Sequence, residues 1–370
     1  MAGKTISCAL TTYNSNAFLE KQLDSLKNQQ LPFDEVIIID DASTNDTVDR
    51  LHAYIDQNQL ENWKVIVHEE NKGFIESFRD SLKYCTKDLI FLCDHDDLWY
   101  KTKTQVMKDE FEQYPDLKVL ACSFDLIDEN DEKIEDTLLP RRANHNLIRR
   151  PIDPGLLNVM KPEDLVACNI APGCSMAMTR DVAEKYIDLA GDLHLPHDWA
   201  ISIIAALEDG LCYLDQPLMG YRQHDANTLG LARRSEFEKR TDAAGFEADQ
   251  KKDMVTLFRR MAAERGSLKL MENVSQAYGE RYEAMMEHSL YSLAKLLFSP
   301  VAPGFKLTIG MDIKSMLTGR SRPAERPAQS SQKPPAEKSS QPESEAQKTD
   351  PANAGAADSG KEPDPKNTRQ

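Results

Sequence analysis

The sequence predicts an α/β fold with a mainly parallel central sheet flanked by helices, then a helical C-terminal extension and a disordered tail. Two observations support the first part. Over the first 125 residues, short apolar runs rich in Val and Ile alternate with segments of helical periodicity. These runs are apolar along nearly their whole length, as in strands buried on both faces. Such alternation is typical of parallel βαβ units.

The expected elements of this first part follow in chain order. The apolar runs predict strands at residues 6–12, 35–39, 63–67, 89–93 and 119–123. Apolar residues three or four positions apart predict helices at residues 16–28, 44–58, 73–84 and 103–114. In the second of these helices, Val48, Leu51 and Ile55 share one face.

The second part of the chain is less regular. Residues 140–172 are rich in Pro, Asn and Arg and predict an irregular segment. After it we expect a strand at 174–178, a helix at 197–208, a strand at 211–214 and mostly helix from 236 to 298. The predicted domains are therefore an α/β domain over 1–230, a helical extension over 231–320 and a tail over 321–370.

The tail has nothing to bury. Residues 321–370 contain no Val, Ile, Leu, Met, Phe, Trp, Tyr or Cys, and they hold eight of the nineteen prolines. Such a segment cannot offset the entropy lost on ordering, so it is expected to be disordered. A linker, a solubilising segment and an arm that docks a protein partner all remain open.

The charge of the chain excludes one class of partner. Its 370 residues carry a net charge of −16, from 45 basic and 61 acidic residues, and the eight basic and eight acidic residues of the tail cancel. A nucleic-acid binder normally shows a basic surface, so no nucleic-acid partner is expected. The apolar runs are far shorter than the roughly 20 residues of a membrane span. No signal peptide is expected either.

The seven cysteines indicate a reducing compartment. They are odd in number, scattered, mostly inside apolar runs, and form no CxxC pair. We therefore expect buried free thiols in the cytoplasm, and neither a zinc site nor a disulfide framework.

Polar side chains gather where the predicted strands end. The first strand runs into Thr11-Thr12-Tyr13-Asn14, the second into Asp40-Asp41, the third is followed by Asn71-Lys72-Gly73, and the fourth ends in Asp94-His95-Asp96-Asp97. Ligands of open parallel sheets bind at the carboxyl ends of the strands, so these clusters are expected to meet on one edge.

The Asp94–Asp97 segment is the densest cluster. Three carboxylates within four residues repel one another unless a cation lies among them. Oxygen ligands on a loop suit Mg²⁺ or Mn²⁺, with phosphate oxygens completing the coordination shell. A solvated acidic turn that caps the next helix is the alternative. For Asp40-Asp41, helix capping and recognition of a nucleobase N–H are both open.

Two further candidates lie in the second half. Asp198, in the LPHDW segment, is either an N-terminal helix cap or a general base. His224, in the YRQH segment, is either a metal ligand beside Asp96, a contact to phosphate, or a structural histidine. GxGxxG and GxxxxGK[ST] are both absent from the sequence, so neither a Rossmann dinucleotide site nor a P-loop is supported.

These motifs together resemble a known family. In order, the segments TTYN, EVIIIDDAS, NKGF, FLCDHDDLW, LPHDW and YRQH resemble family 2 glycosyltransferases of the GT-A fold, and most of all the bacterial rhamnosyltransferase type. The resemblance covers about residues 4–230. It implies inverting transfer of a sugar from a nucleotide diphosphate, UDP or dTDP, to a hydroxyl of a glycan or lipid-linked glycan in surface polysaccharide assembly.

The resemblance also implies roles for single residues. Residues 1–100 would bind the nucleotide and residues 101–230 the acceptor. Thr11 and Tyr13 would line the base pocket, Asp41 would read the pyrimidine ring, and Asp94 would lie near the ribose. Asp96 and His224 would be ligands of Mg²⁺ or Mn²⁺, and Asp198 would be the catalytic base. Many relatives carry an arginine after the Asn-x-Gly segment, but Arg79 stands one position late and receives no role.

Two rival functions are open at this point. One is a metal-dependent nucleotidyltransferase acting on sugar phosphates, although TTYN lacks the glycine-rich loop usual in those enzymes. The other is a GT-A scaffold without activity, which binds a partner through the extension or tail. Residues 285–298 also present an apolar face, which either packs on the α/β domain or contacts the inner face of the cell membrane.

Overall fold

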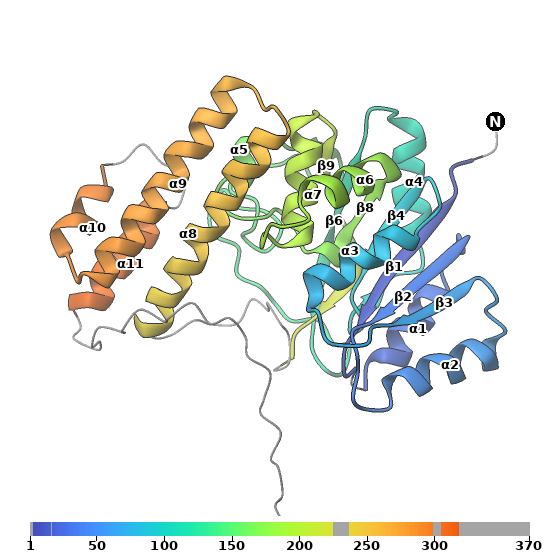
Figure 1. Ribbon diagram of the computed structural model, residues 1–370. Coiled ribbons are helices and arrows are strands. Elements are labelled where there is room, and N and C mark those ends of the chain that lie inside the picture. The colour runs from blue at the N-terminus through green and yellow to red at the C-terminus, as the bar shows by residue number, and fades with distance from the viewer. Residues whose placement is uncertain (1–2, 16, 225–236, 299–304, 318–370) are drawn as a thin grey trace, which may run out of the picture. The chain divides into compact units, whose positions relative to one another are not determined.

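The computed structural model describes residues 3–15, 17–224, 237–298 and 305–317 (Figure 1). The described residues all belong to one unit, residues 1–324. The predicted disordered tail, residues 321–370, lies outside the described residues.

Strands and helices alternate through the first part of the chain, as predicted. The first eleven elements are β1 (Ile6–Thr12), α1 (Leu19–Lys27), β2 (Glu35–Asp40), α2 (Thr47–Asn58), β3 (Trp63–Val67), α3 (Phe74–Tyr84), β4 (Leu89–Cys93), β5 (Leu98–Trp99), α4 (Lys103–Gln113), β6 (Val119–Ile127) and β7 (Leu157–Val159). The others are α5 (Pro162–Leu165), a 3₁₀ turn η1 (Gly173–Ser175), β8 (Met176–Thr179), α6 (Arg180–Leu189), α7 (His197–Leu207), β9 (Leu211–Arg222), α8 (Phe237–Arg260), α9 (Arg265–Met286), α10 (Leu290–Leu296) and α11 (Phe305–Leu317).

One sheet joins all the described strands. Its order is β3-β2-β1-β4-β8-β6-β9-β5, with β7 paired to β9. The ladders among β1 to β4 are parallel, as is β6 with β9, whereas β8 runs antiparallel to both its neighbours, and β5 and β7 run antiparallel to β9. The prediction of a mainly parallel sheet therefore holds for the first half only. The second half is mixed, because β8 enters from the long irregular segment and not from a crossover helix.

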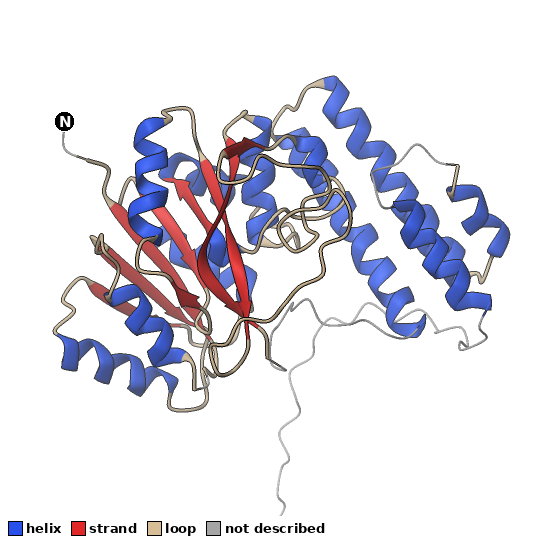
Figure 2. Cartoon of the chain, turned by 180° about the vertical axis from the view of Figure 1, so that it is seen from behind, coloured by secondary structure: helices blue, strands red, loops and turns tan. Residues whose placement is uncertain are grey.

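The central strands β1 and β4 are buried on both faces, which explains why they are almost entirely apolar. Successive residues of a strand point to opposite faces. Accordingly, Ala9 and Ile37 belong to one hydrophobic cluster with α3, α6 and α7, while Cys8 and Val36 belong to another with α1, α2 and α4. Figure 2 shows the sheet between these helices. All seven cysteines are free and six are buried, as predicted, and Cys168 is half-buried.

The predicted end of one strand is wrong, because turn-forming residues interrupt its apolar run. The strand expected at 211–214 continues to Arg222, although Asp215, Gln216 and Pro217 suggest a turn. Its pairing with β6 shifts register between Cys122 and Ser123, so a bulge accommodates this polar segment within the strand. The helices α6 and α11 and the short strands β5 and β7 were not predicted.

The helical extension packs on the α/β domain through a buried lysine. The Nζ atom of Lys251 in α8 donates to the Ala167 carbonyl at 3.2 Å and lies 4.0 Å from the ring centre of Trp199. Burial lowers the pKa of Lys251 to about 7. Trp199 follows the predicted base Asp198, so the extension contacts the segment that carries this residue.

The apolar face at 285–298 is partly buried, and contact with a membrane stays a prediction. Leu293 and Leu296 of α10 are buried, whereas Tyr291 and Phe298 are more than 80% exposed. Most of this face thus packs within the extension, against α9 and α11. Among the described residues, no helix combines the length and apolar character needed to cross a membrane.

Candidate active site

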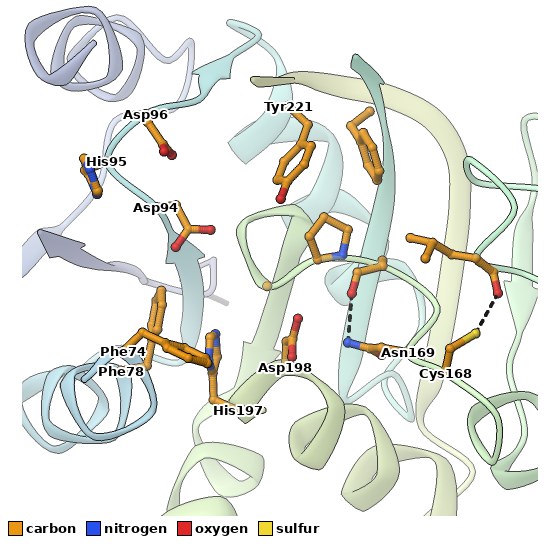
Figure 3. Close-up of a pocket in the computed structure, with 15 residues that line it drawn as sticks. Phe74, Phe78, Asp94, His95, Asp96, Cys168, Asn169, His197, Asp198 and Tyr221 are labelled. Carbon is orange, nitrogen blue, oxygen red and sulfur yellow. Dashed lines mark hydrogen bonds between the residues drawn. The ribbon is translucent and has the colours of Figure 1, made fainter. Parts of the chain in front are cut away.

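A cavity of about 270 Å³ opens beside the carboxyl end of β4. Its walls come from α3, the loop after β4, β6, the segment 168–173, the start of α7 and β9. Aromatic rings and three carboxylates dominate the lining: Phe74, Phe78, Phe124, Tyr221, Asp94, Asp96 and Asp198. Figure 3 shows the three carboxyl groups facing a common space. The cavity thus joins residues that are a hundred positions apart in the sequence.

Asp198 stands in the first turn of α7, at the floor of the cavity. Its Oδ1 atom accepts a hydrogen bond of 2.8 Å from the Trp199 amide. Burial raises the pKa of Asp198 to about 6, although hydrogen bonds from Trp199, Asn169 and Gly173 act in the opposite direction. A carboxyl group with such a pKa is ionised at neutral pH and is a stronger base than an exposed aspartate.

Asp96 lies beside His224, and the role of both as metal ligands stays a prediction. The Asp96 Oδ2 and His224 Nε2 atoms are 2.9 Å apart. Burial acts to raise the pKa of Asp96, but the hydrogen bond from His224 and the positive charge of nearby imidazoles outweigh it, so the pKa is lowered. Asp96 lines the cavity, whereas His224 lies behind it, against the ring of Phe18.

The neighbouring carboxyls Asp94 and Asp97 have raised pKa values, because both are buried and both lie near other carboxylates. Burial, followed by the charges of Asp97 and Asp96, raises the pKa of Asp94 well above its usual value. Burial and Asp96 raise that of Asp97 to about 7. One ligand atom each from Asp94, Asp97 and Cys174 lie within 4.8 Å of one another.

The donor set fits a hard divalent ion on the cavity side of this loop. Asp94 and Asp96 offer carboxylate oxygens to the cavity, and bound positive charge would relieve their repulsion. The inner side is less suitable, because the ammonium group of Lys103 already donates to the Cys174 carbonyl, 2.5 Å away. We therefore regard Asp97 and Cys174 as support for the loop.

Arg222 holds this loop in place, a role that the sequence did not reveal. Its backbone N–H donates to Asp97 Oδ1 at 3.1 Å, and its Nε donates to the Asp96 carbonyl at 2.8 Å. The side chain is fully buried and also forms an ion pair with Asp131. Because Arg222 precedes His224 by two residues, β9 positions both partners of Asp96.

The predicted base-binding residues lie outside the lining of this cavity. Both Asp41 oxygens accept hydrogen bonds of 2.8 Å, Oδ1 from Lys72 N–H and Oδ2 from Gly73 N–H, and His68 Nδ1 also lies 2.8 Å from Oδ1. These bonds outweigh the effect of burial and lower the pKa of Asp41. Asp41 therefore joins the loop after β2 to the loop after β3.

The other residues of this region differ in exposure. Thr11 is buried at the end of β1, while the ring of Tyr13 is 46% exposed and open to stacking. Asp40 accepts hydrogen bonds from Thr12 Oγ1 and Ser43 and forms no cap on α2. Arg79 pairs with Glu76 and donates to the Ala190 carbonyl, away from the cavity, in agreement with its having no assigned role.

Several cavity residues carried no recognisable signal in the sequence. Phe74 and Phe78 are one helical turn apart on α3, a spacing that predicts only a buried face. His197 stacks on Phe78 with 3.9 Å between ring centres. Asn169 and Gly173 come from the irregular segment, whose path no periodicity describes.

Gly173 allows the close approach of α7 to this segment. A Cβ atom at this position would lie 2.7 Å from His197 Nε2 and 3.3 Å from Asp198 Cβ. We expect Gly173→Ala to displace both side chains and to lower kcat/KM by about 10–100-fold, because displacements near 1 Å cost this much in positioned groups. Gly279→Ala is the matched control, since nothing lies within 4 Å of the added atom. Equal kcat/KM in the two variants, measured by steady-state kinetics, contradicts the prediction.

Comparison with known proteins gives a family match over just under half of the chain: the family model "Glycosyl transferase family 2" matches residues 7–187. An uncharacterized glycosyltransferase of Nostoc sp. (strain PCC 7120) is 25% identical over 225 residues, which are 60% of this chain and 66% of the relative. A putative teichuronic acid biosynthesis glycosyltransferase of Bacillus subtilis (strain 168) is 32% identical over 100 residues, which are 27% of this chain and 39% of the relative.

A solved structure supports the fold. The mannosyltransferase PcManGT from Pyrobaculum calidifontis, in complex with GDP-Man and Mn²⁺, superimposes with a TM-score of 0.52 at 15% identity, covering 85% of each chain. The predicted GT-A fold is thereby confirmed. The chain spans 66% or less of the length of the curated relatives that it matches.

Proposed function

Residues 7–187 belong to glycosyl transferase family 2, and from this premise we propose that the chain is an inverting glycosyltransferase. It would transfer a sugar from a nucleotide diphosphate, UDP or dTDP, to an acceptor hydroxyl. One observation carries the proposal: Asp94, Asp96 and Asp198, from distant segments, line the same cavity. This convergence supports a substrate that presents both a diphosphate and a hydroxyl.

The proposed chemistry assigns each carboxylate a different task. Asp198 would accept the proton of the acceptor hydroxyl while its oxygen attacks the anomeric carbon from the face opposite the diphosphate. A single displacement of this kind inverts the anomeric centre. Asp94 and Asp96, with His224 behind them, would hold Mg²⁺ or Mn²⁺, and the bound ion would supply positive charge for the diphosphate.

The nucleotide would lie next to this cavity, at the ends of β1 and β2. Tyr13 offers an exposed ring for stacking on the base, and Thr11 precedes it by two residues. Asp41 already interacts with the backbone N–H groups of Lys72 and Gly73 and with the side chains of His68 and Ser77, so we propose that it shapes the base pocket and reads the base from this fixed position. Residues 1–100 would form the nucleotide half of the catalytic domain, and residues 101–230 the acceptor half.

The acceptor belongs to bacterial surface polymers in this proposal. The teichuronic acid relative supports a glycan or lipid-linked glycan, and the buried free thiols support a cytoplasmic place for the reaction. Contact with the inner face of the membrane and docking of a partner by the tail stay predictions.

A screen of UDP-, dTDP- and GDP-sugars with Mn²⁺ tests the function directly. A cognate donor is expected to raise the melting temperature, because it binds only the folded protein. It should also release nucleoside diphosphate, whereas a nucleotidyltransferase releases pyrophosphate. dTDP-rhamnose tests the rhamnosyltransferase resemblance. Absence of both binding and nucleoside diphosphate release across the panel contradicts the proposal.

The pH dependence of kcat/KM tests the base. In the protein without substrate, the pKa of Asp198 is raised to about 6, so its carboxyl group is mostly ionised above this pH and mostly protonated below it. We expect kcat/KM to fall about tenfold per pH unit below pH 6 and to be level toward pH 8. An acidic limb near pH 4, the range of an ordinary aspartate, is the result that contradicts this assignment.

A further inference from the structure

The helix α10 has one buried side and one exposed side. Leu293 and Leu296 are buried, whereas Tyr291 is 82% exposed. Phe298, in the turn after α10, is 87% exposed. Lys295 is exposed as well, and it follows Tyr291 by four residues and precedes Phe298 by three. At these spacings the three side chains lie along one side of the helix, opposite the buried leucines.

The next helix, α11, repeats this division. Phe305 and Ile309 are buried, whereas Lys306 and Lys314 are exposed, eight positions and thus about two turns apart. Met311, which is 44% exposed, adds an apolar side chain. Because α10 and α11 pack against each other (Figure 1), these exposed side chains come from two adjacent helices of the extension.

The charge of this region differs from that of the rest of the chain. The chain has a net charge of −16, but residues 289–317 contain three lysines and a single acid, Asp312. Asp312 is fully buried and pairs with one arginine of α8 and one of α9. The nearest exposed acids before this region, Glu283 and Glu287, stand at the end of α9. Within the described part of the chain, no ion pair involves Lys295, Lys306 or Lys314.

We refer to five exposed residues as the lysine–aromatic surface: Tyr291, Lys295, Phe298, Lys306 and Lys314. A second protein is a poor match for this surface, because protein interfaces are depleted in lysine. The headgroup layer of an anionic membrane is a better match. Aromatic rings enter this layer, and each lysine near anionic lipid raises binding roughly fivefold.

We propose that the lysine–aromatic surface binds the headgroups of anionic phospholipids and holds the extension on a membrane surface. The lysine ammonium groups would contact lipid phosphates, while the rings of Tyr291 and Phe298 would enter the headgroup layer. A contact of this kind lies at the membrane surface and needs no helix that crosses it. Lipid binding goes beyond the proposed transfer reaction and can be measured without a sugar substrate.

Co-sedimentation of the full chain with lipid vesicles tests the lysines. Vesicles of phosphatidylglycerol and phosphatidylcholine are compared with vesicles of phosphatidylcholine alone. The test variant combines Lys295→Gln, Lys306→Gln and Lys314→Gln, and its control makes the same change at three exposed lysines outside the extension: Lys64, Lys101 and Lys161. We expect the wild type and the control to bind the anionic vesicles, and the test variant to bind them about 100-fold more weakly. Raised salt should weaken the binding of the wild type.

A second pair of variants tests the aromatic rings. Tyr291→Ser with Phe298→Ser removes both rings, and Tyr84→Ser with Tyr114→Ser is the matched control at rings that are 45% and 42% exposed. We expect the first variant to bind anionic vesicles at least about tenfold more weakly, because the apolar area that enters the headgroup layer is lost. The control should bind like the wild type. Since Tyr291 and Phe298 are exposed, their replacement should leave the melting temperature close to that of the wild type.

Three results overturn lipid binding by this surface: no binding of the wild type to the anionic vesicles, equal binding to the two kinds of vesicle, and test variants that bind as their controls do. Sedimentation velocity covers the alternative occupant, a second copy of the chain. A wild-type dimer that dissociates in Tyr291→Ser with Phe298→Ser shows that the surface joins two copies, and it also rejects the proposal.

Donor hydrolysis without vesicles reports on the glycosyltransferase function separately. A wild type that binds anionic vesicles but hydrolyses no nucleotide sugar contradicts the proposed function and supports the lipid surface. Normal hydrolysis without any vesicle binding rejects the lipid surface alone.

Discussion

Asp198→Asn is expected to lower kcat by about 10²–10⁴-fold while the Kd for the donor stays within a few-fold of the wild type. The loss equals the usual contribution of a positioned general base. Asparagine has nearly the same shape, and its amide oxygen can still accept from the Trp199 N–H as Asp198 Oδ1 does. Binding and folding should therefore survive a change that removes the proton acceptor.

The measurement combines single-turnover transfer with donor titration. Asp188→Asn, an exposed aspartate on the neighbouring helix α6, is the matched control and should behave as the wild type. Normal turnover in Asp198→Asn removes this residue from the mechanism. A donor Kd that rises as much as kcat falls assigns Asp198 to binding instead.

The sequence predicted the first half of the fold closely because the strands β1, β2 and β4 are buried on both faces. β1, β3 and β4 begin and end where the apolar runs do. The helices differ only by a few residues at their ends, where capping competes with the apolar pattern. Local sequence patterns thus suffice to predict a strand or helix when a whole face of it packs in the hydrophobic core.

Sequence motifs identified the carboxylates that line the cavity, but not the residues that support them. Asp94 and Asp96 follow β4 directly, and His224, a candidate ligand beside Asp96, lies 2.9 Å from the Asp96 Oδ2 atom. His197 and Gly173 meet across the fold, and their contact depends on the path of the irregular segment. Arg222 is a similar case, since a buried arginine within an apolar strand reveals its partners only in three dimensions.

Because several carboxylates gather around Asp96, we expect sugar transfer to be lost when divalent ions are removed. Burial and the charges of neighbouring carboxylates, including Asp96, raise the pKa of Asp94 and of Asp97. A divalent ion would lower this repulsion and stabilise the leaving diphosphate, an effect worth several kcal/mol. Chelation with EDTA should therefore reduce transfer by about 10²-fold or more, and Mn²⁺ or Mg²⁺ should restore it.

A binding measurement separates this site from the catalytic step. Mn²⁺ with UDP should raise the melting temperature of the wild type, because it binds the folded protein, and should leave that of Asp96→Ala unchanged. Asp116→Ala, an exposed aspartate after α4, is the control and should respond like the wild type. Asp96→Ala should lose activity to about the level of the chelated wild type and gain nothing from added metal. If transfer continues fully in EDTA and elemental analysis shows no bound metal, the reaction needs no divalent ion. If Asp96→Ala still responds to Mn²⁺ like the wild type, the metal ligands lie elsewhere.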